Sequence, residues 1–400
     1  MRAIIIGAGI AGPSLGAFLA KAGIESVICE ARDLSTESQG AFLGVAPNGM
    51  RVLTELGIAT RVEAIGAVCE GFAFHNAAGK QVGLIDRSDD LAKLGTRLVM
   101  TKRGPLQRVL LDEAARRGVK IRDRARLLEI DRSNPKLVVA RFEDGREESG
   151  DLVIGCDGLR SRVRSLVFPN QPPPEYSGLL DFGGYARIHE TPLEVGWNVM
   201  VFGKRAFFGA FRTSPDKHEP GEIWWFHNGG EAQPLRSLEP EQRRERILHA
   251  HAGDPAWIAA CVEATPQILG PWPLHEVAAL SRWHVGRVAV IGDAAHATSP
   301  SAGQGASLAL EDAMVLARYL RDQPDPNHAF ASLERIRRPR VETIVRQSRR
   351  NARPKAMPGP IAAWVRDRAL PIFIGLGARA QDRGYAYRID WDEAPDSPTR

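Results

Sequence analysis

Apolar and polar positions alternate in two different ways along this chain of 400 residues. Residues 3–6 form a continuous apolar run, which is typical of a strand buried on both faces of a parallel sheet. The next stretch places Leu15 and Phe18 on one face of a helix that Gly23 can end, and residues 26–30 return to a strand-like run. This strand–helix–strand order predicts a Rossmann-like α/β unit at the N-terminus.

A different pattern occupies the region from about residue 176 to residue 273. Short runs rich in aromatic and β-branched residues predict an antiparallel sheet there, and they lie at 198–202, 206–211 and 222–227. Two helices are expected within the same region, at 239–252 and 255–263.

The C-terminal part of the chain is expected to be helical. Residues 329–350 predict an Arg-rich helix that is kinked or split at Pro339. Residues 360–378 are apolar but are interrupted by Pro371. Because this stretch is too short and broken to cross a bilayer, we expect it to pack near a substrate entrance, and residues 394–400 to form a loose tail.

Three glycines follow the first apolar run directly, in the sequence Gly7-Ala8-Gly9-Ile10-Ala11-Gly12. Gly7 permits a tight turn out of the strand, Gly9 lets the backbone approach a pyrophosphate, and Gly12 lets the next helix pack closely on the strand. The N-terminus of that helix directs N–H groups at the phosphates. Glu30 ends the second strand-like run, where its carboxylate can accept hydrogen bonds from an adenosine ribose. The motif predicts a dinucleotide site but leaves FAD and NAD open.

Two later strand-like runs also end in glycine and aspartate. One ends in Asp157-Gly158 and the other in Gly292-Asp293, which is followed by a segment containing Pro300, Gly303, Gln304 and Gly305. Asp293 can accept hydrogen bonds from ribityl hydroxyls, and the glycines let backbone N–H groups approach a flat ring system. A helical stretch from about residue 306 directs its positive end to the same place.

These motifs, in this order, resemble those of the class A flavoprotein monooxygenases, the 4-hydroxybenzoate hydroxylase-like family, and the resemblance covers nearly the whole chain. It implies a two-domain α/β fold: a Rossmann-like FAD-binding domain, an inserted antiparallel-sheet substrate domain and C-terminal helices. The expected boundaries are 1–175 and 274–325 for the discontinuous FAD-binding domain, 176–273 for the substrate domain, and 326–400 for the C-terminal region.

The resemblance also implies a set of FAD contacts. It adds Arg103, which would open a helix beside the cofactor, and Leu127, whose backbone would pass the adenine. No arginine lies between Gly40 and Pro47, where some family members carry one, so the handling of NAD(P)H stays open. The expected cofactor-binding residues are Gly7, Gly9, Ile10, Ala11, Gly12, Glu30, Ala31, Arg32, Arg103, Leu127, Asp157, Gly292, Asp293, Pro300, Gly303, Gln304, Gly305 and Ala306.

The activity that the resemblance implies is a monooxygenation. In this family NADPH or NADH reduces FAD, O₂ then forms a flavin C4a-hydroperoxide, and one oxygen atom passes to the substrate. We expect hydroxylation of a small aromatic or polyketide-like compound. No protein general base is assigned, since His296 is more simply a structural residue of its turn. Aromatic residues of the predicted sheet that could line the substrate site, or simply belong to the core, are Phe202, Phe208, Phe211, Trp224 and Phe226.

Other functions on the same scaffold stay open. A FAD-dependent reductase or dehydrogenase would oxidise NAD(P)H without inserting oxygen. A flavin-dependent halogenase would carry a WxWxIP signature, which the sequence lacks. A FAD-holding protein without turnover is the non-enzymatic alternative.

Composition narrows the range of partners. The net charge of +5 is spread along the chain except at 335–353, which lacks the interleaved aromatics of a nucleic-acid-binding module, so we expect no nucleic acid partner. The four cysteines are far apart and show no metal-binding spacing, which favours a reduced cytoplasmic location and no metal. Without a secretory signal or a spanning run, no stable membrane insertion is expected. A monomer and a homodimer are both compatible with the sequence.

Overall fold

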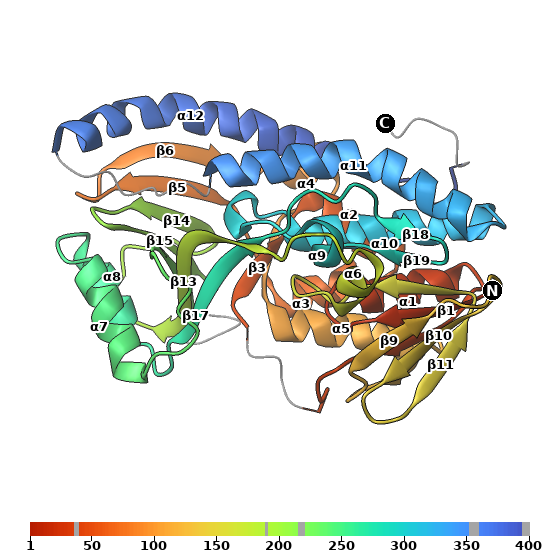
Figure 1. Cartoon of the computed structure of the whole chain (residues 1–400). Coiled ribbons are helices and arrows are strands. Elements are labelled where there is room, and N and C mark those ends of the chain that lie inside the picture. Colours follow the sequence, from red (N-terminus) through yellow and green to blue (C-terminus); the bar gives the residue numbers. More distant parts are fainter. Residues whose placement is uncertain (36–39, 189–190, 215–220, 352–359, 394–400) are drawn as a thin grey trace.

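The computed structural model describes residues 1–35, 40–188, 191–214, 221–351 and 360–393. Within these ranges the chain forms two large sheets and two small ones, with two long C-terminal helices packed across them (Figure 1).

The first large sheet is built mainly from parallel strands. All its neighbouring pairs are parallel except the antiparallel pair at the β18 edge. α1 (Ala11–Lys21) connects its first two strands and packs against α10 (Gly305–Asp322). The predicted Rossmann-like fold is therefore confirmed. In spatial order the strands are β18 (His284–Val285), β19 (Val288–Val290), β12 (Leu152–Gly155), β1 (Arg2–Ile6), β2 (Glu25–Cys29) and β8 (Lys120–Arg122).

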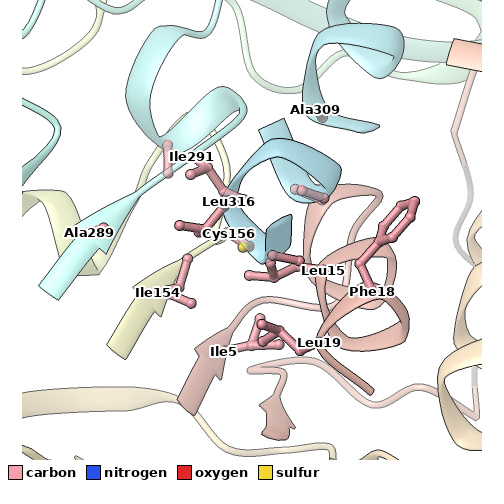
Figure 2. Packing of buried hydrophobic residues seen from close by; sticks show 14 of the residues in the cluster. Ile5, Leu15, Phe18, Leu19, Ile154, Cys156, Ala289, Ile291, Ala309 and Leu316 are labelled. Atoms are coloured by element: carbon pink, nitrogen blue, oxygen red, sulfur yellow. The ribbon is translucent and has the colours of Figure 1, made fainter. Parts of the chain in front are cut away.

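The core of this part lies between the sheet and the two helices. Ile5 and Ile154 come from adjacent strands and meet Leu15 and Leu19 of α1 and Leu316 of α10 (Figure 2). All five side chains are 0% exposed. Burying each such side chain stabilises the fold by roughly 1.5–3 kcal/mol. Because β1 is covered on both faces, successive residues are all buried, and this explains why the apolar run at the N-terminus is continuous.

Smaller elements surround this core. One small sheet has the order β11–β10–β9 and the other β3–β7–β4. Their strands are β9 (Leu127–Asp131), β10 (Val138–Phe142), β11 (Glu147–Gly150), β3 (Phe42–Val45), β7 (Val99–Lys102) and β4 (Ala67–Val68). The short helices are α2 (Pro47–Glu55), α3 (Ala59–Ile65), α4 (Asp90–Leu94), α5 (Arg103–Arg116), α6 (Arg162–Val167), α9 (Asp293–His296) and the 3₁₀ turn η1 (Pro300–Ala302).

The second large sheet is antiparallel, as predicted, except where β14 and β5 pair in parallel. β5 and β6 come from outside 176–273, so the sheet draws on a distant part of the chain. The division into domains stays a proposal, and we extend its substrate domain by residues 71–86. In spatial order the strands are β17 (Leu269–Glu276), β13 (Glu175–Arg187), β16 (Glu222–Gly230), β15 (Ala206–Arg212), β14 (Trp197–Phe202), β5 (Gly71–Asn76) and β6 (Gln81–Asp86).

Helices cover one face and one edge of the second sheet. α7 (Pro240–Ala250) and α8 (Ala256–Glu263) bury one face, and both lie where helices were predicted. α12 (Pro360–Ala386) lies along β6, the edge strand (Figure 1). α11 (Pro326–Asn351) packs against α10 and runs through Pro339 without a break, as α12 does through Pro371, so a split at either proline is wrong. No helix of the described ranges combines the length and apolarity needed to cross a bilayer.

A buried ion cluster joins α10 to α11. Arg337 of α11 is 0% exposed, and its guanidinium lies 2.6 Å from Glu311 Oε2 and 2.8 Å from Asp312 Oδ1. The other oxygen of Asp312 accepts hydrogen bonds from the backbone N–H of Gly292 at 3.0 Å and from Nε2 of His296 at 2.6 Å. Burial would raise the pKa of Asp312, but His296 and Arg337 outweigh burial and lower this pKa to about 2.

The same cluster reaches α2. Arg340 pairs with Glu311 at 2.8 Å, and Asn48 Nδ2 donates to Glu311 Oε1 at 2.7 Å and to Gln304 Oε1 at 3.0 Å. The cluster thus ties α2, α10, α11 and the turn after β19 together. Such a group is costly to disrupt because any carboxylate that loses its partner stays buried.

Replacing Arg337 tests how much the cluster supports the fold. We expect Arg337→Ala to lower the free energy of unfolding by about 3–5 kcal/mol, measured by urea denaturation of FAD-saturated protein. Arg141→Ala is the matched control, because Arg141 also contacts three carboxylates but is 40% exposed, so its loss should barely move the midpoint. Equal destabilisation by the two substitutions would contradict this assignment.

Candidate functional site

The glycine-rich loop after β1 is as tight as its sequence predicts. Gly7 has a φ of +106°, and its N–H donates to the Cys29 carbonyl at 2.8 Å. A Cβ on Gly12 would lie 1.9 Å from the Gly7 carbonyl oxygen. α1 therefore starts immediately against the turn. No side chain caps its N-terminus, which leaves that end open to an anion.

Glu30 stabilises this loop from the end of β2. Its carboxylate is buried and accepts hydrogen bonds from the backbone N–H of Ala8 at 2.8 Å and of Arg32 at 3.0 Å. The Arg32 side chain adds an ion pair at 3.0 Å. The ribose contact expected of Glu30 stays a proposal, and Oε2, which accepts only from Ala8 among the described residues, retains a second lone pair with which to make it.

Arg103 lies over the glycine loop at the start of α5. Its Nη2 would be 3.9 Å from a Cβ on Gly9, and Gly40 packs against its aliphatic stem. Its guanidinium makes no hydrogen bond or ion pair with the part of the chain that the structure describes. Burial, and next the charge of Arg32, lower the pKa of Arg103, while Asp293 and Glu30 oppose them. A half-buried cation without an anionic partner fits a pyrophosphate.

The carboxylate of Asp157 has local hydrogen-bond partners, and the FAD contact expected of it stays a prediction. Its carboxylate accepts hydrogen bonds from the Ser161 hydroxyl at 2.5 Å and from the backbone N–H groups of Arg162 at 2.7 Å and Val163 at 3.0 Å. Burial raises its pKa against the effect of these hydrogen bonds. Asp157 thus caps α6, and any contact with FAD would use its remaining lone pairs.

Arg164 links two motifs, and the sequence pattern alone did not single it out. It is 3% exposed, and it donates to the carbonyl of Ala294 at 2.7 Å and to that of Leu159 at 2.6 Å. The turn after β12 therefore fixes the turn after β19. The only sequence signal is an arginine three residues after the capping Ser161.

The turn after β19 and the start of α10 face open space. Asp293 is exposed, with no hydrogen-bond partner among the described residues. A Cβ on Gly303 or Gly305 would meet no atom within 4 Å, and Gly303 has a φ of +62°. No side chain caps α10. Backbone N–H groups and a free carboxylate thus lie at one open surface, which we call the FAD groove because the ring system and ribityl chain of a flavin require such groups.

The contacts predicted for the other FAD-binding residues stay predictions. Gln304 is buried and held by Asn48, so only its backbone can reach a ligand, and Leu127 is likewise buried. The Nε2 atom of His296 is hydrogen-bonded to Asp312, in agreement with a structural role. The remaining predicted positions lie at the starts of helices or directly after β2, and they are Ile10, Ala11, Ala31, Pro300 and Ala306.

The face of the second sheet that points away from α7 and α8 is aromatic. Strand register places Trp224 opposite Phe211, and Phe226 lies two residues further along the same face. Phe202 is paired with Phe207 on this face, and their ring centroids lie 5.2 Å apart. Phe211 and Trp224 are fully buried, whereas Phe202 and Phe226 are half-buried and can border a ligand.

Phe208, the remaining aromatic candidate, does not share this face. It points to the opposite side of the sheet, where its ring stacks on Trp225 with centroids 5.4 Å apart beneath α7 and α8. Phe42 of β3 packs against this aromatic face, with its ring centroid 5.8 Å from that of Trp224 and 6.2 Å from that of Phe226, and it pairs with Lys102, the residue before Arg103.

A cleft of about 530 Å³ opens beside this junction, and sequence reasoning did not find it. Lys102 lies 2.7 Å from Glu222 and 4.2 Å above the ring of Tyr185, whose hydroxyl donates to the Gly40 carbonyl at 2.9 Å. Arg187 and Leu269 complete much of the lining. The adjacency of Lys102 to Arg103 was the only signal in the sequence.

Residues 1–348 match the family model described as FAD binding domain. The chain belongs to the class A FAD-dependent monooxygenases. The aurachin C monooxygenase/isomerase of Stigmatella aurantiaca is 30% identical over 375 residues, which are 92% of this chain and 94% of that protein. The 3-amino-4-hydroxybenzoate 2-monooxygenase PtmB3 of Streptomyces platensis is 29% identical over 98% of this chain and 97% of its own.

A solved structure agrees with this assignment. Klebsiella pneumoniae HpxO, crystallised with FAD and uric acid, has a TM-score of 0.85 at 26% identity and covers 96% of both chains. FAD is thus the cofactor of this class A monooxygenase, and the open groove at the glycine loop and the start of α10 fits it.

Replacing Arg103 tests its position over the cofactor. Loss of a hydrogen bond to a charged group costs about 1.5–3 kcal/mol, so Arg103→Ala should raise the Kd for FAD roughly 10- to 100-fold in a flavin fluorescence titration. Arg108→Ala is the control on the same helix, since Arg108 is exposed and, among the residues that the structure describes, donates only to the Leu34 carbonyl at 3.2 Å. An unchanged Kd in the Arg103 variant would remove the pyrophosphate contact from the model of the site.

Proposed function

We propose that this monooxygenase hydroxylates a small aromatic substrate, using NADPH or NADH and O₂. The observation that supports this most directly is the aromatic face of the second sheet, where Trp224 and Phe226 pack against Phe42, the residue that pairs with Lys102. The names of the relatives point the same way, since urate and an aminohydroxybenzoate are both planar ring compounds.

Side chains of the protein would bind and orient the substrate and shield it from water. Phe202 and Phe226 would pack against the substrate ring, and the buried Phe211 and Trp224 behind them would keep water out. The N-terminus of α10 would stabilise negative charge at the groove. Bound FAD would supply the redox chemistry, accepting hydride and activating O₂.

We infer that NAD(P)H docks transiently. The sequence holds no second GxGxxG motif that would build a separate nicotinamide domain. The cleft lined by Lys102 and Arg187 lies beside Gly40 and Arg103, so it offers cationic groups next to the flavin groove. We also place the protein in the cytoplasm, because the four cysteines are all free and buried.

Turnover with product analysis tests the proposed reaction. We expect a substituted phenol or hydroxybenzoate to accelerate NAD(P)H oxidation by FAD-loaded protein, and the product to gain the mass of one oxygen atom. NAD(P)H consumption that leaves every aromatic compound unchanged in mass would favour a reductase, and a chlorinated product would favour a halogenase.

A pair of phenylalanine variants tests the orientation of the sheet. Phe226→Ala should raise the substrate KM about tenfold or more, since it removes a ring from the proposed pocket wall. Phe208→Ala removes the same side chain from the face under α7 and α8, so it should destabilise the fold but leave KM nearly unchanged. A larger KM effect at Phe208 would invert the assignment of the two faces.

A further inference from the structure

The outward face of α12 carries an apolar stripe that neither the fold nor the cofactor site explains. Val365, Ile372, Phe373 and Leu376 are 53%, 67%, 66% and 57% exposed. In the described part of the chain, every other helix or strand has at most one large apolar side chain this exposed. Clustered exposure of this kind marks an interaction surface more often than isolated exposure does.

The opposite face of α12 packs against the second sheet. Asn76 of β5 donates to Asp367 at 2.7 Å, and Ile374 fills the space above Gly83 of β6. Arg87 hydrogen-bonds to Gln381 at 2.5 Å. These contacts recur every seven residues, or two helical turns, so they share one side of the helix.

The stripe recurs with the same spacing on the other side. Val365 and Ile372 are seven residues apart, and Leu376 follows four residues later. Because the inner contacts fix the rotation of α12, this stripe cannot turn toward the sheet.

The charges of α12 are divided between its faces. Its aspartates form ion pairs on the inner side: Asp367 also pairs with Arg366, and Asp382 pairs with Arg87. Arg379 and Arg383 are exposed, and they continue the outward side seven residues beyond Ile372 and Leu376. The outward face is therefore apolar and cationic.

The size of the stripe favours a lipid surface over a second protein copy. The four side chains expose roughly 400–500 Å² of apolar surface, about half of the ~800 Å² that each partner buries in a standard protein interface. Shallow insertion beneath lipid headgroups needs no such area, and it places arginines beside lipid phosphates.

We propose that the outward face of α12 docks this protein on the surface of a bilayer that contains anionic lipids. Ile372, Phe373 and Leu376 insert among the headgroups, and Arg379 and Arg383 contact the phosphates. The helix lies in the plane of the interface and does not cross the bilayer. Docking is independent of the proposed reaction, because none of these residues borders the FAD groove.

Vesicle co-sedimentation of the FAD-loaded protein tests this proposal. The protein should bind vesicles of phosphatidylcholine with phosphatidylglycerol, bind phosphatidylcholine alone more weakly, and lose affinity at high salt. Combining Ile372→Ser with Phe373→Ser should weaken binding at least about tenfold. Combining Arg379→Glu with Arg383→Glu should abolish the preference for the anionic lipid.

Matched controls separate docking from folding. Leu128→Ser removes a 47% exposed leucine from β9, and it should leave vesicle binding unchanged. Bound FAD and circular dichroism report folding, and Leu376→Ser gives a second, milder change in the stripe. The proposal is overturned if the unaltered protein binds neither vesicle, or if the stripe variants bind like Leu128→Ser. A dimer in sedimentation velocity that the Ile372→Ser, Phe373→Ser variant converts to a monomer would assign the stripe to a second copy of the chain.

Discussion

The cofactor groove depends on one buried guanidinium. Glu311 and Asp312 are adjacent on α10 and wholly buried, and Arg337 lies against both carboxylates, while Arg340 supports Glu311 and His296 supports Asp312. Asp312 then holds the turn at Gly292 through its second oxygen, and Glu311 holds α2 through Asn48. The turn after β19 and the start of α2 are therefore positioned by one buried charge cluster on α10 and α11.

Local motifs could be predicted because their steric requirements depend on residues that are close together in the sequence. Gly7 and Gly12 could be assigned from spacing alone, since a side chain on Gly12 would collide with the Gly7 carbonyl. Asp157 and Asp293 mark the limit of this approach. Both end buried strands beside a glycine, yet one caps a helix and the other faces the groove. Only the hydroxyl of Ser161 and the helix that follows distinguish them.

Non-local packing decided what the sequence could not. Alternation separated Trp224 from Trp225, but which face α7 and α8 would cover depended on contacts between distant elements. The sequence therefore could not show that Phe208 lies under these helices. The parallel pairing of β5 with β14 joins residues more than a hundred positions apart, and the hydrophobic pattern of the sequence does not predict this pairing. The cleft at Lys102 and Glu222 likewise forms only when β7 and β16 meet.

The pairing of β5 with β14 also limits how this scaffold can be recombined. A cassette of residues 176–273 moved into another host would leave β14 as an unpaired edge strand, open to non-native strand addition. A chimera that exchanges substrate preference would have to carry the hairpin of β5 and β6 as well, together with the helix that lies along it. Variation in ligand preference on this scaffold therefore proceeds more readily by single side chains on the aromatic face than by exchange of contiguous modules.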